Sequence, residues 1–181
     1  GDGARFSLAG NGMRVAEPEF VFCFGTGLPP RPQSYGADEV LAAVATLHVG
    51  IEVPDSRFAD FVQAGEAQLL ADDACAHQFV LGLAATGEWR ALDLSRHTVQ
   101  ATVVQAGSTR LRREGIGAAV LGDPRLALAW LVNDLRARGI GLLAGQFVTT
   151  GTCMAPLALE PGDTVEADFG VLGRVSAGFT A

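Results

Sequence analysis

Two stretches of the chain indicate its fold: Glu17-Pro18-Glu19-Phe20-Val21-Phe22 and, later, Ile51-Glu52-Val53-Pro54-Asp55-Ser56-Arg57. Glu17 and Glu19 stand two positions apart in a run that continues with apolar residues, as is typical of a strand. Because successive side chains of a strand alternate between its two faces, both carboxylates are expected on one face. Like charges that share a face repel each other unless something positive lies between them. Glu52 belongs to a second apolar run with the composition of a strand.

Three carboxylates that rise from apolar strands indicate a hard divalent cation with oxygen ligands, Mg²⁺ or Mn²⁺. Two other interpretations stay open from the residues alone. A Glu-x-Glu pair on a strand is often simply a solvated face. Arg57 also follows Glu52 closely enough to neutralise its charge without any metal. The spacing therefore permits a metal site without requiring one.

The two opening stretches also resemble the catalytic domain of the fumarylacetoacetate hydrolase superfamily, and within it the branch of 2-keto-4-pentenoate hydratases and 4-oxalocrotonate decarboxylases. Further blocks agree, in the order of the family: Leu70–Cys75, Phe79–Gly82, Gly122–Leu131, Ala144–Thr152, Pro161–Asp163 and Val165–Gly170. The resemblance runs from about Glu17 to Phe179. It implies an α+β fold rich in strands, a mixed β-roll with a few helices, as in the C-terminal domain of fumarylacetoacetases.

The resemblance also implies which residues form the site. The ligands of Mg²⁺ or Mn²⁺ would be Glu17, Glu19 and Glu52. The substrate carboxylate would be held through hydroxyl and backbone N–H groups by Thr150, Gly151 and Thr152. Charge-assisted hydrogen bonds from such donors bind a carboxylate without a cationic side chain.

Asp72 and Asp73 are the expected catalytic pair, with Asp72 supporting the ligands or the proton-transfer network. Asp73 departs from the family, which usually carries Asn there, and a carboxylate at neutral pH cannot donate the hydrogen bond that an amide can. We expect its charge to raise the pKa values of neighbouring acids. A local turn made by two aspartates is the alternative interpretation.

Relatives act on 2-oxo or 2-hydroxydienoic acids in the degradation of aromatic compounds, so the resemblance implies a metal-dependent hydratase, that is, a lyase. The alternatives are a 2-oxo acid decarboxylase of the same branch, an acylpyruvate-type C–C hydrolase, or a catalytically weak partner subunit. The expected partner is a small acid of this class, with a homo-oligomer or a complex with another pathway enzyme also implied.

Composition limits the other possibilities. The chain of 181 residues has a net charge of −7, and its 13 basic residues are all arginines, which argues against a nucleic-acid or anionic-membrane surface. The absence of lysine excludes Schiff-base chemistry and a phosphate-loop lysine within this chain. Three scattered cysteines and the lack of a long apolar run predict reduced thiols in a cytoplasmic protein.

We expect residues 1–181 to form one catalytic domain, because no linker or repeat interrupts them. Relatives are longer at the N-terminus, so the expectation is that this domain is the later portion of a longer polypeptide. Helices are expected at 39–47 and 125–138, with a shorter one at 57–62 and another turn or two at 65–71. Strands are expected around 13–24, 97–105, 147–150, 164–169 and 174–179.

Overall fold

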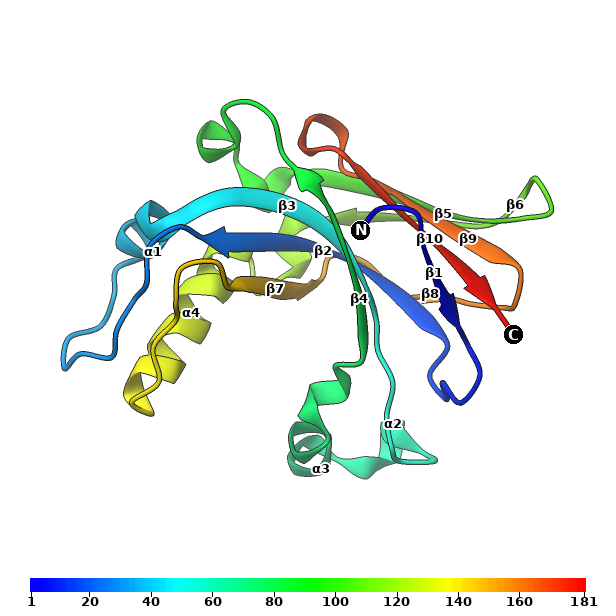
Figure 1. Cartoon of the computed structure of the whole chain (residues 1–181), viewed down its shortest axis with the longest axis horizontal. Coiled ribbons are helices and arrows are strands. Elements are labelled where there is room, and N and C mark those ends of the chain that lie inside the picture. The colour runs from blue at the N-terminus through cyan, green and yellow to red at the C-terminus, as the bar shows by residue number, and fades with distance from the viewer.

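The computed structural model describes residues 1–181 and contains two β-sheets that pack against each other (Figure 1). The first sheet has the order β1-β10-β9-β5-β6, with the bounds β1 Ala4–Ser7, β10 Arg174–Thr180, β9 Asp163–Asp168, β5 Thr98–Gln105 and β6 Ser108–Ile116. Its neighbouring strands are antiparallel, except that β1 and β10 run parallel. The first and last strands of the chain therefore lie side by side.

The second sheet carries the acidic residues that opened the sequence. Its order is β4-β3-β2-β7, with the bounds β4 Gln78–Ala84, β3 Val44–Val53, β2 Val15–Phe24 and β7 Phe147–Thr152, while the short strand β8 (Leu157–Ala158) pairs with the start of β2. All of these pairs are antiparallel. Together the two sheets confirm the predicted β-rich fold with few helices.

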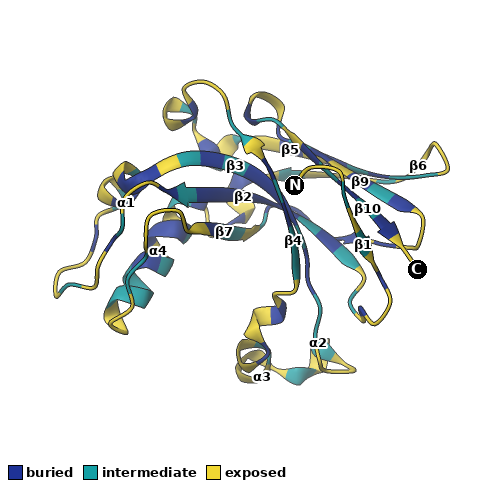
Figure 2. Ribbon diagram, in the orientation of Figure 1, coloured by how far each residue is buried: buried dark blue, intermediate teal, exposed yellow.

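The core lies between the sheets and is built by strand alternation. Phe20, Phe22 and Phe24 of β2 are at most 1% exposed, because they point toward the first sheet. The ring of Phe20 meets Phe169, just after β9, edge to face at 5.2 Å between centroids. Figure 2 shows the buried residues concentrated where the sheets overlap. The alternate residues of β2, beginning with Glu17 and Glu19, consequently point away from this core, on what we call the outward face.

Four helices complete the fold: α1 Ala37–Ala43, α2 Phe61–Ala64, α3 Glu66–Ala71 and α4 Pro124–Ala137. The start of α4 follows the prediction, with Pro124 in its first turn and the Asp123 carboxylate accepting a hydrogen bond from the Arg125 N–H at 2.8 Å. Leu128 and Val132 bury its apolar stripe. No helix is both long and apolar enough to cross a membrane.

The prediction of a helix over 39–47 was wrong beyond Ala43. Strand β3 begins at Val44, and Thr46, Leu47 and His48 pair with β2. Cross-strand pairing outweighs local helix propensity here, since a Val-Ala-Thr-Leu segment fits a half-buried strand well. His48 therefore lies within a strand, where its two ring nitrogens are hydrogen-bonded to the Thr46 hydroxyl and the Gly82 carbonyl at 2.9 and 3.0 Å.

Residues 54–77, which connect β3 to β4, form an arm that projects beyond the sheets (Figure 1). The predicted helix over 57–62 was wrong in its bounds: α2 begins only at Phe61, because the Asp60 carboxylate caps it by accepting from the Gln63 N–H. The turns predicted at 65–71 are confirmed as α3. No residue of α2 or α3 is buried. The arm is attached to the rest of the molecule chiefly through its first and last residues.

Candidate metal centre

Strands β2 and β3 bring the three glutamates together. Glu17 is paired directly with Glu52, and Glu19 is paired with Gly50, two residues before Glu52. In antiparallel strands directly paired residues share a face, so all three side chains stand on the outward face. One carboxylate oxygen from each residue lies within 4.8 Å of the others. The structure thus groups the residues that the sequence indicated as ligands.

The cluster lacks any positive charge of its own. Glu19 is only 1% exposed, yet none of the ion pairs of the molecule includes Glu17, Glu19 or Glu52. Arg57, which might have neutralised Glu52, pairs instead with Asp72. Buried charges are normally paired or bound to metal, because desolvating an isolated carboxylate is costly.

The absence of a nearby positive charge is also reflected in raised pKa values for Glu17 and Glu19. Burial raises the pKa of Glu17 to about 7, and the charge of Glu52 adds to this rise. Burial also raises the pKa of Glu19 well above its ordinary value, with a further rise from its hydrogen bond to Glu52. The Gly151 N–H, which donates to Glu19 Oε2 at 2.8 Å, opposes this rise. Three acidic oxygen donors without a counter-ion fit a hard divalent cation such as Mg²⁺ or Mn²⁺.

Asp72 has a different environment from the glutamates. Its carboxylate is 6% exposed and accepts hydrogen bonds from the Ser56 hydroxyl at 2.6 Å and the Arg57 N–H at 2.9 Å, as well as from the Arg57 guanidinium. These contacts, the Ser56 hydroxyl first, lower the pKa of Asp72 to about 2. Asp72 therefore stays charged at neutral pH and holds the chain where it leaves β3. Its participation in catalysis stays a prediction.

Replacing Asp72 with asparagine is expected to reduce the loss of unfolding free energy at acidic pH. The unfolded chain binds a proton at Asp72 below about pH 3.9, whereas the folded chain does so only near pH 2. Stability supplied by this carboxylate is therefore complete above that range and is lost as pH falls from about 4 to about 2. Urea unfolding between pH 2.5 and 7 should show a smaller loss in Asp72→Asn than in the parent. Equal slopes in the two proteins would contradict this arrangement.

Asp73 stands next to Asp72 but outside the glutamate cluster. Its side chain is exposed, and its backbone has φ = 56°, followed by Ala74 at 51° and Cys75 at 66°. Asn is among the residues that best tolerate this left-handed conformation. The backbone thus provides a conformational reason for Asn at this position, independent of hydrogen bonding to a substrate. The catalytic role of Asp73 stays a prediction.

The expected carboxylate-binding segment lies beside the cluster, since Thr152 is paired with Glu19. Its donors are already engaged within the protein: the Thr150 hydroxyl donates to the Phe20 carbonyl at 3.1 Å, and the Thr152 hydroxyl donates to the Met154 carbonyl at 2.9 Å. The Gly151 N–H serves Glu19, as described above. In this structure the segment orients the Glu19 carboxylate and lines a groove of about 360 Å³ with Leu121 and Trp130. Its role in substrate binding stays a prediction.

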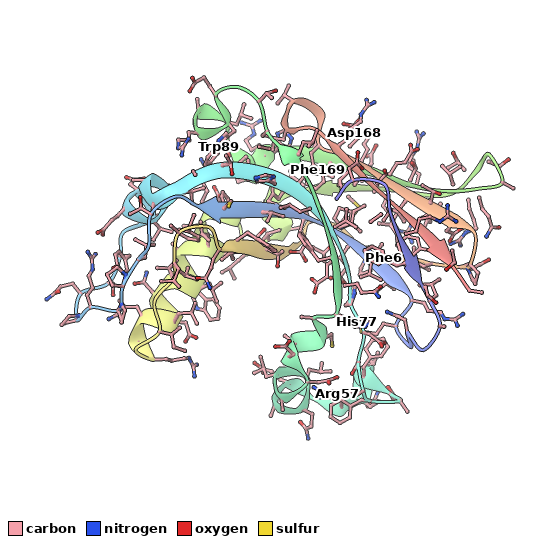
Figure 3. The ribbon with its side chains drawn as sticks, in the orientation of Figure 1. Phe6, Arg57, His77, Trp89, Asp168 and Phe169 are labelled. Carbon is pink, nitrogen blue, oxygen red and sulfur yellow. The ribbon has the colours of Figure 1, made fainter.

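Sequence reasoning missed an aromatic pair on the same outward face. Phe79 of β4 is paired with Glu52, and Phe147 of β7 is paired with Cys23. Their rings stack at 5.6 Å between centroids, with an interplanar angle of 21°. The sequence feature that could have indicated the pair was Gly50, two positions before Glu52, because a glycine in a strand leaves room for a ring to pack on the sheet. Figure 3 labels Arg57 on the arm and His77 just before β4, the strand that carries Phe79.

Comparison with known proteins places this arrangement in a family. No protein-family model matches the chain. It is 35% identical over 142 residues to a 4-oxalocrotonate decarboxylase of Pseudomonas putida, covering 78% of this chain and 51% of the relative. It is 32% identical over 180 residues to a 2-keto-4-pentenoate hydratase of Burkholderia vietnamiensis, covering 99% of this chain and 66% of that relative.

Among solved structures, the 4-oxalocrotonate decarboxylase of Pseudomonas putida G7, complexed with magnesium and adipate, superposes with a TM-score of 0.81 at 28% identity. That match covers 98% of this chain and 65% of the solved chain. The chain thus spans about half to two thirds of the length of these relatives. Sequence and fold agree that it belongs to the fumarylacetoacetate hydrolase superfamily, close to its branch of 4-oxalocrotonate decarboxylases and 2-keto-4-pentenoate hydratases.

Proposed function

We propose that this chain is the catalytic domain of a divalent-metal-dependent lyase that hydrates 2-hydroxy-2,4-dienoates or their 2-oxo-4-enoate tautomers. The observation that carries the proposal is the cluster of Glu17, Glu19 and Glu52, which share one face without a positive partner. Relatives that are hydratases, and a related structure that holds magnesium, support the choice of reaction and cation.

In this proposal each residue acts through contacts already described. Glu17, Glu19 and Glu52 would hold Mg²⁺ or Mn²⁺ in place of the missing positive charge. A cation at this position supplies electrostatic stabilisation for negative charge that develops on substrate oxygens. The Gly151 N–H fixes the Glu19 carboxylate, and Thr152 lies beside it. Asp72 positions Ser56 and Arg57 at the end of the strand that carries Glu52.

Decarboxylation is the second candidate, favoured by the 35% identity to a 4-oxalocrotonate decarboxylase. Both reactions need the same stabilisation of negative charge on the substrate, so the glutamate cluster supports either. A C–C hydrolase and a catalytically weak partner subunit are further outcomes of the test. We also propose, from the family, that the whole protein forms a homo-oligomer.

A substrate panel tests the function. With Mg²⁺, the ultraviolet absorbance of a 2-hydroxy-2,4-dienoate is expected to decay in the presence of the protein, and EDTA should stop the decay. Product mass distinguishes hydration, which adds water, from decarboxylation, which loses CO₂. An acylpyruvate in the panel detects hydrolysis. Metal binding without turnover of any member would contradict the enzyme proposal and favour the partner subunit.

A further inference from the structure

The stacked rings of Phe79 and Phe147 span the outward face of the second sheet. Phe79 lies on β4 and Phe147 on β7, which are the two outermost strands, with β3 and β2 between them. The backbones of β4 and β7 are separated by three strand spacings of about 4.8 Å each. The two rings meet because both side chains lean inward over a curved sheet. We call this pair the aromatic bridge.

The aromatic bridge covers the two central strands. Val21 of β2 belongs to the same face as Glu17 and Glu19, yet it is 0% exposed. Gly50 of β3 lies beneath the Phe79 ring, since a Cβ there would lie only 2.5 Å from Phe79 Cζ and 3.0 Å from Val21 Cγ2. The missing side chain at Gly50 is what allows the ring to settle on the sheet.

The bridge also borders the glutamate cluster. Phe79 is the direct neighbour of Glu52, Gly50 is the direct neighbour of Glu19, and Val21 follows Glu19 by two residues. The aromatic bridge is apolar, and its Phe147 side chain remains 49% exposed. A large aromatic surface that stays half exposed next to a polar cluster is a suitable contact for the hydrocarbon part of a ligand.

We propose that the aromatic bridge is the specificity-determining wall of the site, selecting acids whose far end is an uncharged hydrocarbon. The inference rests on the proposed function, because it takes the acid head of the ligand to lie at the glutamate cluster. A second carboxylate against this wall would lose hydration without gaining a hydrogen bond, which is unfavourable. An alkyl end would instead bury apolar surface against the rings. The substrate class would thus be monocarboxylic dienoates.

Equilibrium binding of two unreactive acids tests the wall without turnover. 2-Oxohexanoate ends in a methyl group, and 2-oxohexanedioate has the same chain length but ends in a carboxylate. At saturating Mg²⁺, titration calorimetry should show the first binding at least about tenfold more tightly than the second. Nuclear Overhauser contacts should join the terminal methyl group to the ring protons of Phe79 and Phe147.

Three variants make the test specific. Phe147→Ala should weaken 2-oxohexanoate binding about tenfold and change 2-oxohexanedioate binding less than about twofold. Gly50→Ala should give the same pattern without removing an aromatic residue, because the new Cβ displaces the Phe79 ring. Leu83→Ala, which removes an 81% exposed apolar side chain from the same strand as Phe79, is the control and should change neither affinity. Melting temperatures confirm that each variant is folded.

The possible outcomes distinguish a failure of the proposed specificity wall from a failure of the proposed lyase function. Equal affinities for the two acids, or equal weakening of both by Phe147→Ala, would overturn the wall while leaving metal-dependent turnover intact. Methyl selectivity without turnover of any dienoate would support the wall as a binding surface and contradict the lyase proposal. Absence of binding by both acids with Mg²⁺ present would overturn both proposals.

Discussion

Replacing Glu19 with glutamine is expected to weaken Mg²⁺ binding at least about 100-fold and to stabilise the metal-free protein. The raised pKa of Glu19 means that the folded chain keeps a proton which the unfolded chain releases above about pH 4.3. Stability of the metal-free protein therefore falls as pH rises above that value. Glutamine has no such proton, so the part of this loss that comes from Glu19 should disappear, while the part that comes from Glu17, whose pKa is raised to about 7, remains. Calorimetric titration with Mg²⁺, and melting curves in EDTA at pH 5 and pH 8, measure the two effects.

The same experiments in Glu166→Gln provide the matched control. Glu166 is an exposed glutamate on β9 that forms no ion pair, so neither quantity should change. Undiminished Mg²⁺ affinity in Glu19→Gln, or in a variant with alanine at both Glu17 and Glu52, would place the cation elsewhere. A lower melting temperature of metal-free Glu19→Gln at pH 8 would contradict the prediction. It would show that the contacts of the charged Glu19 carboxylate outweigh the cost of burying it.

Alanine at Gly117 is expected to cost about 3 kcal/mol or more of unfolding free energy. A Cβ there would lie 1.8 Å from the backbone oxygen of Leu94, so the backbone itself has to move. Gly115→Ala should rank next, since its Cβ would lie 2.4 Å from the Cys153 carbonyl oxygen. Because Cys153 follows Thr152, the pairing partner of Glu19, the second variant should also weaken Mg²⁺ binding.

Urea unfolding of the two variants, with Gly36→Ala as the control, checks this order. A Cβ at Gly36 meets nothing within 4 Å, and the residue precedes α1 with an ordinary φ of −70°. Its replacement should cost no more than about 1 kcal/mol, the usual effect at a helix N-cap. Stability losses at Gly115 and Gly117 as small as that at Gly36 would show that the backbone yields easily at these contacts.

Part of the candidate metal centre could be predicted from the sequence because strand geometry is local. Glu17 and Glu19 share a face through the two-residue period alone, and an apolar run around Glu52 predicts a second strand. The direct pairing of Glu17 with Glu52 is a contact between distant parts of the chain, and the strand pattern alone did not predict it. Family resemblance added the expectation that all three residues act together.

Other features depend on long-range contacts that no local pattern contains. Arg57 had two carboxylates within reach, and only the folded chain shows that it pairs with Asp72. The helix expected up to Leu47 ends early because β2 offers Val44 and its neighbours a pairing partner. The aromatic bridge joins residues 68 positions apart (79 to 147) through the curvature of a sheet, which no periodicity encodes.

The construction of the arm has a consequence for how the molecule opens. Residues 54–77 contribute two helices, α2 and α3, in which no residue is buried, and the contacts of Asp72 with Ser56 and Arg57 join the end of the arm to its beginning. Opening this segment exposes little apolar surface, whereas opening β2 or β3 disrupts the whole core. The free energy of local opening is therefore much smaller in α2 and α3 than in the sheets. We therefore expect the arm to open as a unit of its own, while the amides of β2 and β3 beneath the glutamate cluster stay protected from hydrogen exchange.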